Sequence, residues 1–174
     1  MVELKKFNID FSPNKETPYF QTTNDKRIRF ILDELSLQTT KYIFKKIYKD
    51  KYINTIFISD YIFKNKKPYI NYKKKIGNII SLKNWEEIIE PYEKDDDETK
   101  ILFAKVKRLN FMDLYDYSLH LKKGIPELYI VFYSNEFLVY LNSDVIDIIS
   151  NDKENINKLK KEFKESYNKL YEEY

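Results

Sequence analysis

Few side chains in this sequence have the chemistry that catalysis or metal binding requires. The chain has 174 residues, no cysteine and a single histidine, His120. A histidine can act as a general acid or base because its unperturbed pKa is about 6.5. No motif places an acid or a nucleophile beside His120, so we expect it on the flank of a helix, near that helix's C-terminal end. Without cysteine, thiolate chemistry and cysteine-bound zinc are excluded.

Carboxylates are the other candidates for chemistry, and the densest group is Asp95, Asp96, Asp97 and Glu98. Oxygen ligands of this kind suit Mg²⁺ or Ca²⁺. The run lacks the central glycine of an EF-hand loop, and acidic runs are commonly solvated loops. We therefore predict an acidic loop over residues 93–98, with no bound metal and no cofactor.

A second carboxylate pattern is that of restriction-type nucleases, in which an Asp and a Glu-x-Lys on adjacent strands bind metal and orient water. Glu98-Thr99-Lys100 begins a predicted strand, and Asp60 lies on an earlier one. The same spacing occurs at two other places in this chain rich in Glu and Lys, as chance alone produces. Paired-carboxylate catalysis by Asp144 and Asp147 is a further alternative. We expect no enzyme activity.

Basic and acidic residues are separated along the chain, although the net charge is only +3. Residues 41–75 contain 11 Lys and 2 Asp, whereas residues 85–99 contain 8 acids and 1 Lys. Lysines neutralise phosphates and the interleaved tyrosines stack on bases, so residues 41–75 predict weak, non-specific nucleic-acid contact through Lys73, Lys74 and Lys75. Lys outnumbers Arg 28 to 3, a bias that an AT-rich coding sequence also produces.

The acidic stretch also contains two large aromatic residues, Trp85 and Tyr92. Aromatic side chains are favoured at the centres of protein interfaces, and acids around them accelerate association with a basic partner. The sequence thus predicts a protein-binding surface. Its members are Trp85, Tyr92, Asp95, Asp96, Asp97 and Glu98. The alternative is that Trp85 belongs to the hydrophobic core.

Hydrophobic periodicity and capping residues predict the elements that position these side chains. Residues 1–26 are polar, contain two prolines and predict an irregular segment with one short strand near Phe7–Phe11. Runs of β-branched, aromatic or alternating apolar residues predict strands at 27–32, 54–63, 101–108, 128–133, 137–141 and 145–149, with Tyr69–Lys73 as a hairpin partner. Helices are predicted after the capping residues Ser36, Ser81, Asn110 and Asn151.

Two of these helices are predicted from apolar spacing. The helix after Ser81 has Trp85, Ile88 and Ile89 on one side, and it ends before Pro91. The last helix is predicted to be long because apolar residues recur every three or four positions up to Tyr174. Together the patterns predict a single α+β domain over residues 1–174. It would have an antiparallel or mixed sheet, with about four helices packed mainly on one face.

Short segments at the first predicted strand and near the end of the chain carry a resemblance to a known family. Arg29-Phe30-Ile31-Leu32 stands at the first predicted strand, and Leu138-Val139-Tyr140 precedes Asp144-Val145-Ile146 near the end. With the order of elements over residues 27–170, these segments resemble a small bacterial family known only as a domain of unknown function. That family reads Tyr-Asp-Asp-Arg-Gly where this chain reads Tyr-Leu-Asn-Ser-Asp at residues 140–144. The resemblance implies the α+β fold and no particular activity.

The sequence therefore favours a non-enzymatic protein that binds another protein. A small bacterial chain with a polarised surface and no catalytic set is typical of immunity proteins, so one hypothesis is the neutralisation of a toxin that has a basic domain. Nucleic-acid binding by residues 41–75 is the main alternative, and carboxylate catalysis is the third. The sequence has no long apolar run and no signal-like segment after Met1, so we expect a cytoplasmic protein without membrane contact.

Overall fold

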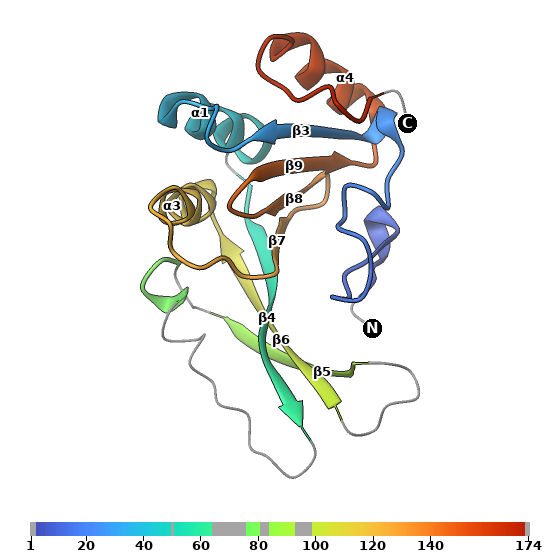
Figure 1. Cartoon of the computed structure of the whole chain (residues 1–174), viewed down its shortest axis with the longest axis vertical. Coiled ribbons are helices and arrows are strands. Elements are labelled where there is room, and N and C mark those ends of the chain that lie inside the picture. The colour runs from blue at the N-terminus through green and yellow to red at the C-terminus, as the bar shows by residue number, and fades with distance from the viewer. Residues whose placement is uncertain (1–2, 50, 64–75, 81–83, 93–98, 173–174) are drawn as a thin grey trace.

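The computed structural model describes residues 3–49, 51–63, 76–80, 84–92 and 99–172. Within these residues, seven strands form one sheet in the order β3-β9-β8-β7-β4-β6-β5, and every neighbouring pair is antiparallel (Figure 1). The strands are β3 (Arg27–Ile31), β4 (Ile53–Phe63), β5 (Trp85–Pro91), β6 (Thr99–Leu109), β7 (Ile130–Tyr133), β8 (Phe137–Leu141) and β9 (Val145–Ser150). The α-helices of the described residues are α1 (Leu37–Tyr48), α3 (Phe111–Lys122) and α4 (Lys153–Glu162).

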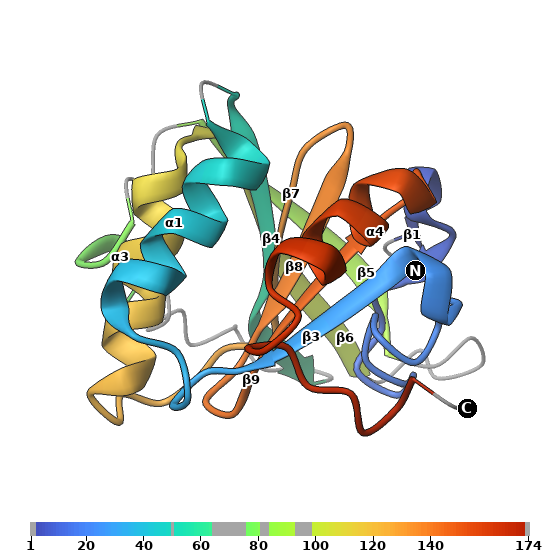
Figure 2. The same cartoon turned by 90° about the horizontal axis from the view of Figure 1, so that it is seen from above.

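The three helices pack on one face of the sheet. Figure 2 shows α1 beside α3, while α4 lies next to β3 and β9. The apolar residues that the helices bury together with the strands form the helix-side core. Its helical members include Ile43, Phe44, Ile47, Leu114, Tyr117, Leu121, Ile156 and Leu159. None of the described helices is long and apolar enough to cross a membrane.

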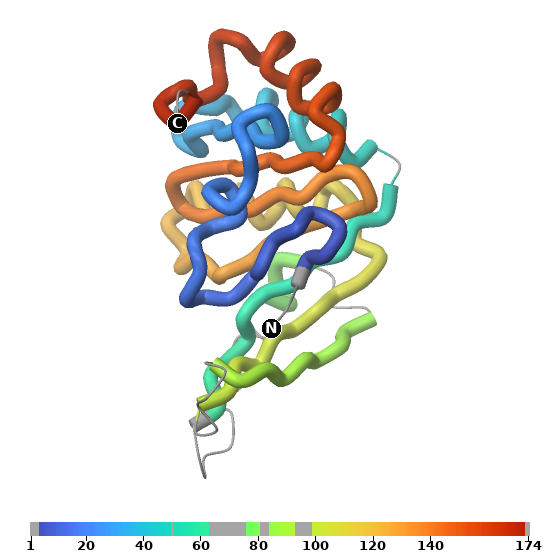
Figure 3. Tube along the Cα trace, turned by 90° about the vertical axis from the view of Figure 1, so that its right-hand side faces the viewer, coloured from blue at the N-terminus to red at the C-terminus, as the bar shows by residue number. Residues whose placement is uncertain are grey.

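The N-terminal segment covers part of the opposite face of the sheet (Figure 3). It contains a hairpin of two short strands, β1 (Glu3–Leu4) and β2 (Ile9–Asp10), and two 3-10 turns, Lys5–Phe7 and Asn24–Lys26. Its apolar residues form the opposite-side core with strand residues. The members include Leu4, Phe7, Ile9, Phe11, Ile56, Phe103, Val131 and Leu138. The segment that the sequence predicts as irregular therefore contributes directly to the hydrophobic core.

Local sequence signals explain where the helices begin and end. The side chains of Ser36 and Asn110 accept backbone N–H hydrogen bonds at 3.0 Å and 2.7 Å, as their predicted capping roles require. After α3, Gly124 has a φ of +73°, a left-handed conformation that glycine adopts without a Cβ clash. The cap of α4 is Asp152 rather than the predicted Asn151.

The predicted helix after Ser81 is wrong, because Trp85–Pro91 form strand β5. Apolar residues at positions 85, 88 and 89 fit a helical period, but Trp and Ile also favour strands. Pairing decides between the two, since β5 forms a seven-residue register with β6 in which Ile88 lies opposite Phe103. The cap residue Ser81 lies outside the described residues, as does the predicted hairpin partner Tyr69–Lys73.

The prediction of about four helices with a long C-terminal helix is also wrong. α4 ends at Glu162, and the chain then turns back so that Asn168 N donates a hydrogen bond of 2.8 Å to Arg29 O on the edge strand β3. Leu170, predicted on a buried stripe, is 67% exposed. The described part of the chain is thus an α+β fold with three α-helices and a larger antiparallel sheet than the sequence predicts.

Candidate interaction surface and pocket

Strand β5 is one edge of the sheet and pairs only with β6 among the described residues. In Figure 1, the β4–β6–β5 part of the sheet extends beyond the helices. Four of the seven residues of β5 are exposed: Glu86, Glu87, Ile89 and Pro91. An edge strand of this kind presents backbone N–H and C=O groups that no strand in the described part of the chain pairs with.

The two predicted interface aromatics lie at this edge but on opposite faces of the sheet. Trp85 is partly buried against the helix-side core, where its ring meets Phe57 edge to face at a centroid distance of 5.6 Å. Tyr92 packs against the opposite-side core, and its ring lies 6.1 Å from that of Tyr61. Trp85 and Tyr92 therefore border the same strand without forming one aromatic patch.

The predicted acidic loop connects β5 to β6. The four acids themselves, Asp95, Asp96, Asp97 and Glu98, lie outside the described residues. The chain leaves the sheet at Tyr92 and returns at Thr99, and Tyr92 N donates a hydrogen bond of 2.9 Å to Thr99 O. The acidic sequence thus starts and finishes at the end of the β5–β6 pair.

β5 is itself acidic, with Glu86, Glu87 and Glu90 and no basic residue. Lys107 on β6 places its Nζ 2.8 Å from Glu86 Oε2, and this hydrogen bond lowers the pKa of the Glu86 carboxyl. Glu87 accepts a hydrogen bond of 3.2 Å from Trp85 Nε1. The side chains of β5 thus combine negative charge with the exposed apolar side chain of Ile89.

The predicted nucleic-acid site is only partly described. Lys73, Lys74 and Lys75 lie outside the described residues. Within the same basic stretch, Lys41 and Lys45 are exposed on one face of α1, and Lys49, the residue that caps the C-terminal end of α1, is exposed as well. Lys41 Nζ lies 5.4 Å from the centre of the Tyr115 ring. These lysines belong to the part of the basic stretch that the structure describes, residues 41–49 and 51–63.

Asp144 and Asp147, the two carboxylates considered for paired catalysis, lie in different surroundings. Asp147 is fully buried and accepts hydrogen bonds from Arg29 Nε at 2.6 Å and Arg29 Nη2 at 2.8 Å, whereas Asp144 is exposed. Burial raises the pKa of Asp147, and Arg29 opposes that rise. Because both Asp147 oxygens are engaged, the arrangement fits a structural ion pair rather than a catalytic pair.

The residues of the nuclease-like pattern are also only partly described. Asp60 lies opposite Leu102, and Lys100 lies opposite Ile62, on the paired strands β4 and β6. Glu98 lies outside the described residues. Among the residues that are described, no three His, Asp or Glu side chains form a group that could hold a metal ion.

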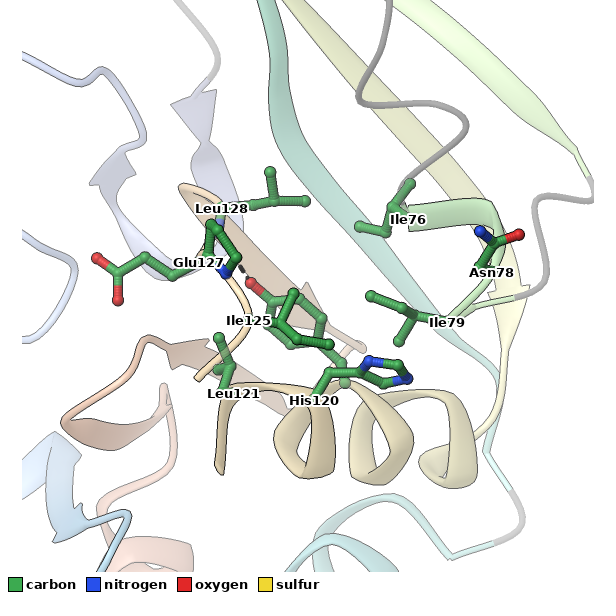
Figure 4. A pocket seen from close by; sticks show the side chains of 10 residues that line it. Ile76, Asn78, Ile79, His120, Leu121, Ile125, Glu127 and Leu128 are labelled. Carbon is green, nitrogen blue, oxygen red and sulfur yellow. Dashed lines mark hydrogen bonds between the residues drawn. The ribbon is translucent and has the colours of Figure 1, made fainter. Parts of the chain in front are cut away.

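The sequence did not predict the pocket between α3 and the turn at residues 76–80 (Figure 4). The pocket has a volume of about 360 Å³. Ten residues from three separate segments line it: Ile76, Asn78, Ile79, Tyr117, His120, Leu121, Ile125, Pro126, Glu127 and Leu128. His120 lies in the last turn of α3, as predicted, and is the only one of the ten that the sequence had singled out. The other lining residues look like ordinary core or loop residues in the sequence.

Comparisons with known proteins add nothing to this geometry. No protein-family model, no curated protein and no solved structure matches the chain. The resemblance to a bacterial family of unknown function stays a prediction. The function must therefore be argued from the β5 edge, the α1 lysines and the pocket.

Proposed function

We propose that this protein acts by binding another protein through the β5 edge, without catalysing a reaction. The observation that carries this proposal is the exposure of Ile89, which is 58% exposed on an edge strand whose outer side has no partner strand among the described residues. A free strand edge can accept a strand from a partner, with backbone hydrogen bonds supplying affinity. Ile89 then supplies an apolar contact at the centre of the edge.

Charge indicates which partner this edge suits. The three acids of β5 and the acidic sequence that follows it repel an identical strand, so two copies of the protein are disfavoured as partners. A basic surface is attracted, and its association rate increases. The edge is therefore suited to a different protein that presents lysine or arginine side chains.

A basic toxin domain that acts on nucleic acid fits this requirement, because such a domain must itself attract phosphates. Neutralisation of such a toxin, in the cytoplasm of a bacterium, is the specific role that we propose for the β5 edge. The negative charge of residues 85–99 supports this role, since that stretch contains 8 acidic residues and only 1 Lys.

The first prediction tests the β5 edge directly. Ile89→Lys should weaken binding of a basic partner by about tenfold or more, because it removes the central apolar contact and adds a repelling charge. Binding to the proteins encoded by neighbouring genes is measured by surface plasmon resonance. Leu170→Lys is the matched control, since Leu170 is 67% exposed and lies on the C-terminal tail. Equal dissociation constants for the two variants would exclude the β5 edge from the interface.

A second candidate function is weak binding of nucleic acid, which the α1 lysines support. Lys41 and Lys45 on one face of α1 and Lys49 at its C-terminal end are all exposed, so they can contact successive phosphates. Arg, the usual reader of bases, is absent from residues 41–75. Any such binding would therefore depend on charge and not on sequence.

A further inference from the structure

The backbone of β5 alternates between groups that point towards β6 and groups that point away from it. The register of β5 with β6 runs without a shift along the whole strand. Beyond one end of this register, Lys107 N donates a hydrogen bond of 3.4 Å to Asn84 O. Beyond the other end, Tyr92 N donates a hydrogen bond of 2.9 Å to Thr99 O. Because hydrogen-bonded residues recur at every second position of an antiparallel pair, the even-numbered residues of β5 turn their N–H and C=O groups towards β6.

The odd-numbered residues consequently turn their backbone groups towards the outer side of β5. Glu87 and Ile89 each present one N–H donor and one C=O acceptor there, whereas Pro91 presents a C=O alone. Proline is tolerated in a sheet where its missing N–H would face away from the neighbouring strand, so the position of Pro91 agrees with this alternation. Within the described residues, no strand or turn pairs with the outer groups of Glu87 and Ile89. An extended chain laid along β5 can therefore bond to all four of them.

The side chains of Glu87 and Ile89 lie on one face of the sheet, because the two residues are two positions apart. Trp85 shares that face, since it packs on the helix-side core and its Nε1 donates to Glu87. Ile89 is nevertheless exposed, because this part of the sheet extends beyond the helices (Figure 1). Glu87 is also exposed and forms no ion pair with the lysines and arginines that the structure describes. A strand beside β5 would thus meet an acidic and an apolar side chain in a fixed order.

We propose that the β5 edge binds an extended segment of the partner protein as an added antiparallel strand, with a β-branched residue opposite Ile89 and a lysine or arginine opposite Glu87. This inference rests on the function proposed above and specifies how the partner binds. Antiparallel pairing agrees with every other pair of the sheet and is slightly more stable per residue than parallel pairing. From its N-terminus, the partner segment then contains an apolar residue, any residue and a basic residue. Matched cross-strand pairs of this kind stabilise neighbouring strands.

Short synthetic peptides test the order of the two side chains. The probe is acetyl-Thr-Thr-Val-Thr-Lys-Thr-Thr-amide, and the control exchanges its valine and lysine, which keeps composition and charge unchanged. Dissociation constants are measured by NMR titration of the ¹⁵N-labelled full chain. We expect the control to bind about threefold more weakly, because both cross-strand pairs are then mismatched.

N-methylated peptides test the backbone pairing. The N–H of the probe's lysine faces the C=O of Glu87 in the proposed register, so its methylation should weaken binding about tenfold or more. The N–H of the preceding threonine points away from β5, so its methylation should change binding by less than about twofold. Both peptides carry the same added methyl group, so only the direction of the methylated N–H distinguishes them.

A charge reversal locates the register on the protein. Glu87→Lys should bind the probe more weakly than the wild type does, and it should prefer a peptide in which glutamate replaces the probe's lysine. Glu34→Lys is the matched control, because Glu34 is an exposed acid on the turn between β3 and α1. This control should retain the wild-type preference for the lysine peptide.

Four results would each overturn the strand-addition proposal. They are that no peptide binds at millimolar concentration, that the exchanged peptide binds as tightly as the probe, that the two N-methylated peptides bind equally, and that Glu87→Lys keeps the wild-type preference. Protection of the Glu87 and Ile89 amide hydrogens from exchange in the free chain would also overturn it, because another segment or a second copy would then cover the edge. The proposed function fails separately, if Ile89→Lys leaves binding of the natural partner unchanged while the peptides behave as expected.

The reverse combination is equally distinct. If the peptides fail but Ile89→Lys still weakens binding of the natural partner, the β5 edge binds that partner by a contact other than an added strand.

Discussion

At the scale of single residues, two buried arginines make contacts that a lysine side chain could not make. The chain has 28 Lys and only 3 Arg, yet Arg27 and Arg29 are both buried in strand β3. Their guanidinium carbons lie 4.1 Å and 4.0 Å from the centre of the Tyr19 ring, which both groups contact. A planar guanidinium can stack on a ring and bind a carboxylate through two hydrogen bonds at the same time, which an ammonium group cannot do.

A prediction about stability follows for Arg29. Arg29→Ala should lower the free energy of unfolding by about 3–5 kcal/mol, because it leaves the buried Asp147 carboxylate without its partner. Arg29→Lys should cost less than Arg29→Ala but clearly more than Arg108→Lys, the same change at the exposed third arginine. Urea unfolding measures all three variants. Equal stability of Arg29→Lys and Arg108→Lys would contradict a need for the guanidinium.

At the scale of elements, α4 is short but well anchored. Phe163, the residue that caps its C-terminal end, is 7% exposed, and its ring meets that of Phe30 edge to face at 5.7 Å. The same end of the helix is tied to α1, since Glu162 accepts a hydrogen bond of 2.8 Å from the Tyr42 hydroxyl. Lys46 on α1 also pairs with Glu162, at 2.7 Å. The end of α4 is therefore part of the core, whereas the chain after it becomes exposed.

This difference gives a second stability prediction. Phe163→Ala should reduce the free energy of unfolding by about 3–5 kcal/mol, since it empties a buried aromatic site. Leu170→Ala removes a side chain that is 67% exposed, and it should change stability by less than about 0.5 kcal/mol. Both are measured by urea unfolding. A loss for Phe163→Ala below about 1 kcal/mol would show that α4 packs loosely on the sheet.

At the scale of the whole molecule, the two charged regions of the sequence lie on different elements. The exposed lysines Lys41 and Lys45 stand on α1, which packs on the helix-side face, whereas the acids of β5 lie at the sheet edge beyond β6. The binding of a basic partner that we propose for the β5 edge would therefore not be directly opposed by the α1 lysines. Separate surfaces also allow the two candidate functions to be tested independently.

Salt dependence distinguishes the two basic segments. If α1 contacts duplex DNA, replacing Lys41, Lys45 and Lys49 by Ala should reduce the log–log salt slope of binding by about 3 × 0.9. The same number of charges is removed in the second variant, which replaces Lys73, Lys74 and Lys75. Fluorescence anisotropy over a salt series measures both slopes. Unchanged slopes in both variants would exclude both lysine groups as the phosphate site.

The sequence by itself determined the features that depend on neighbours in the chain. Ser36, Asn110 and Gly124 act through hydrogen bonds or backbone conformations within a few residues, so the starts of α1 and α3 and the end of α3 could be predicted. The strands β8 and β9 could also be predicted from their apolar runs, because almost every residue of both strands is buried. His120 could be placed in the last turn of α3 because Asn110 and Gly124 fix where that helix begins and ends.

Only the tertiary structure decided features that depend on distant parts of the chain. The spacing of Trp85, Ile88 and Ile89 fits a helix or a strand, and pairing with β6 selects the strand. The helical stripe after Glu162 was misleading because Asn168 instead bonds to Arg29 on β3, far away in sequence. The pocket combines three segments that meet only in the folded protein. In each case a contact between distant residues outweighs local preference, and no periodicity in a single segment records such a contact.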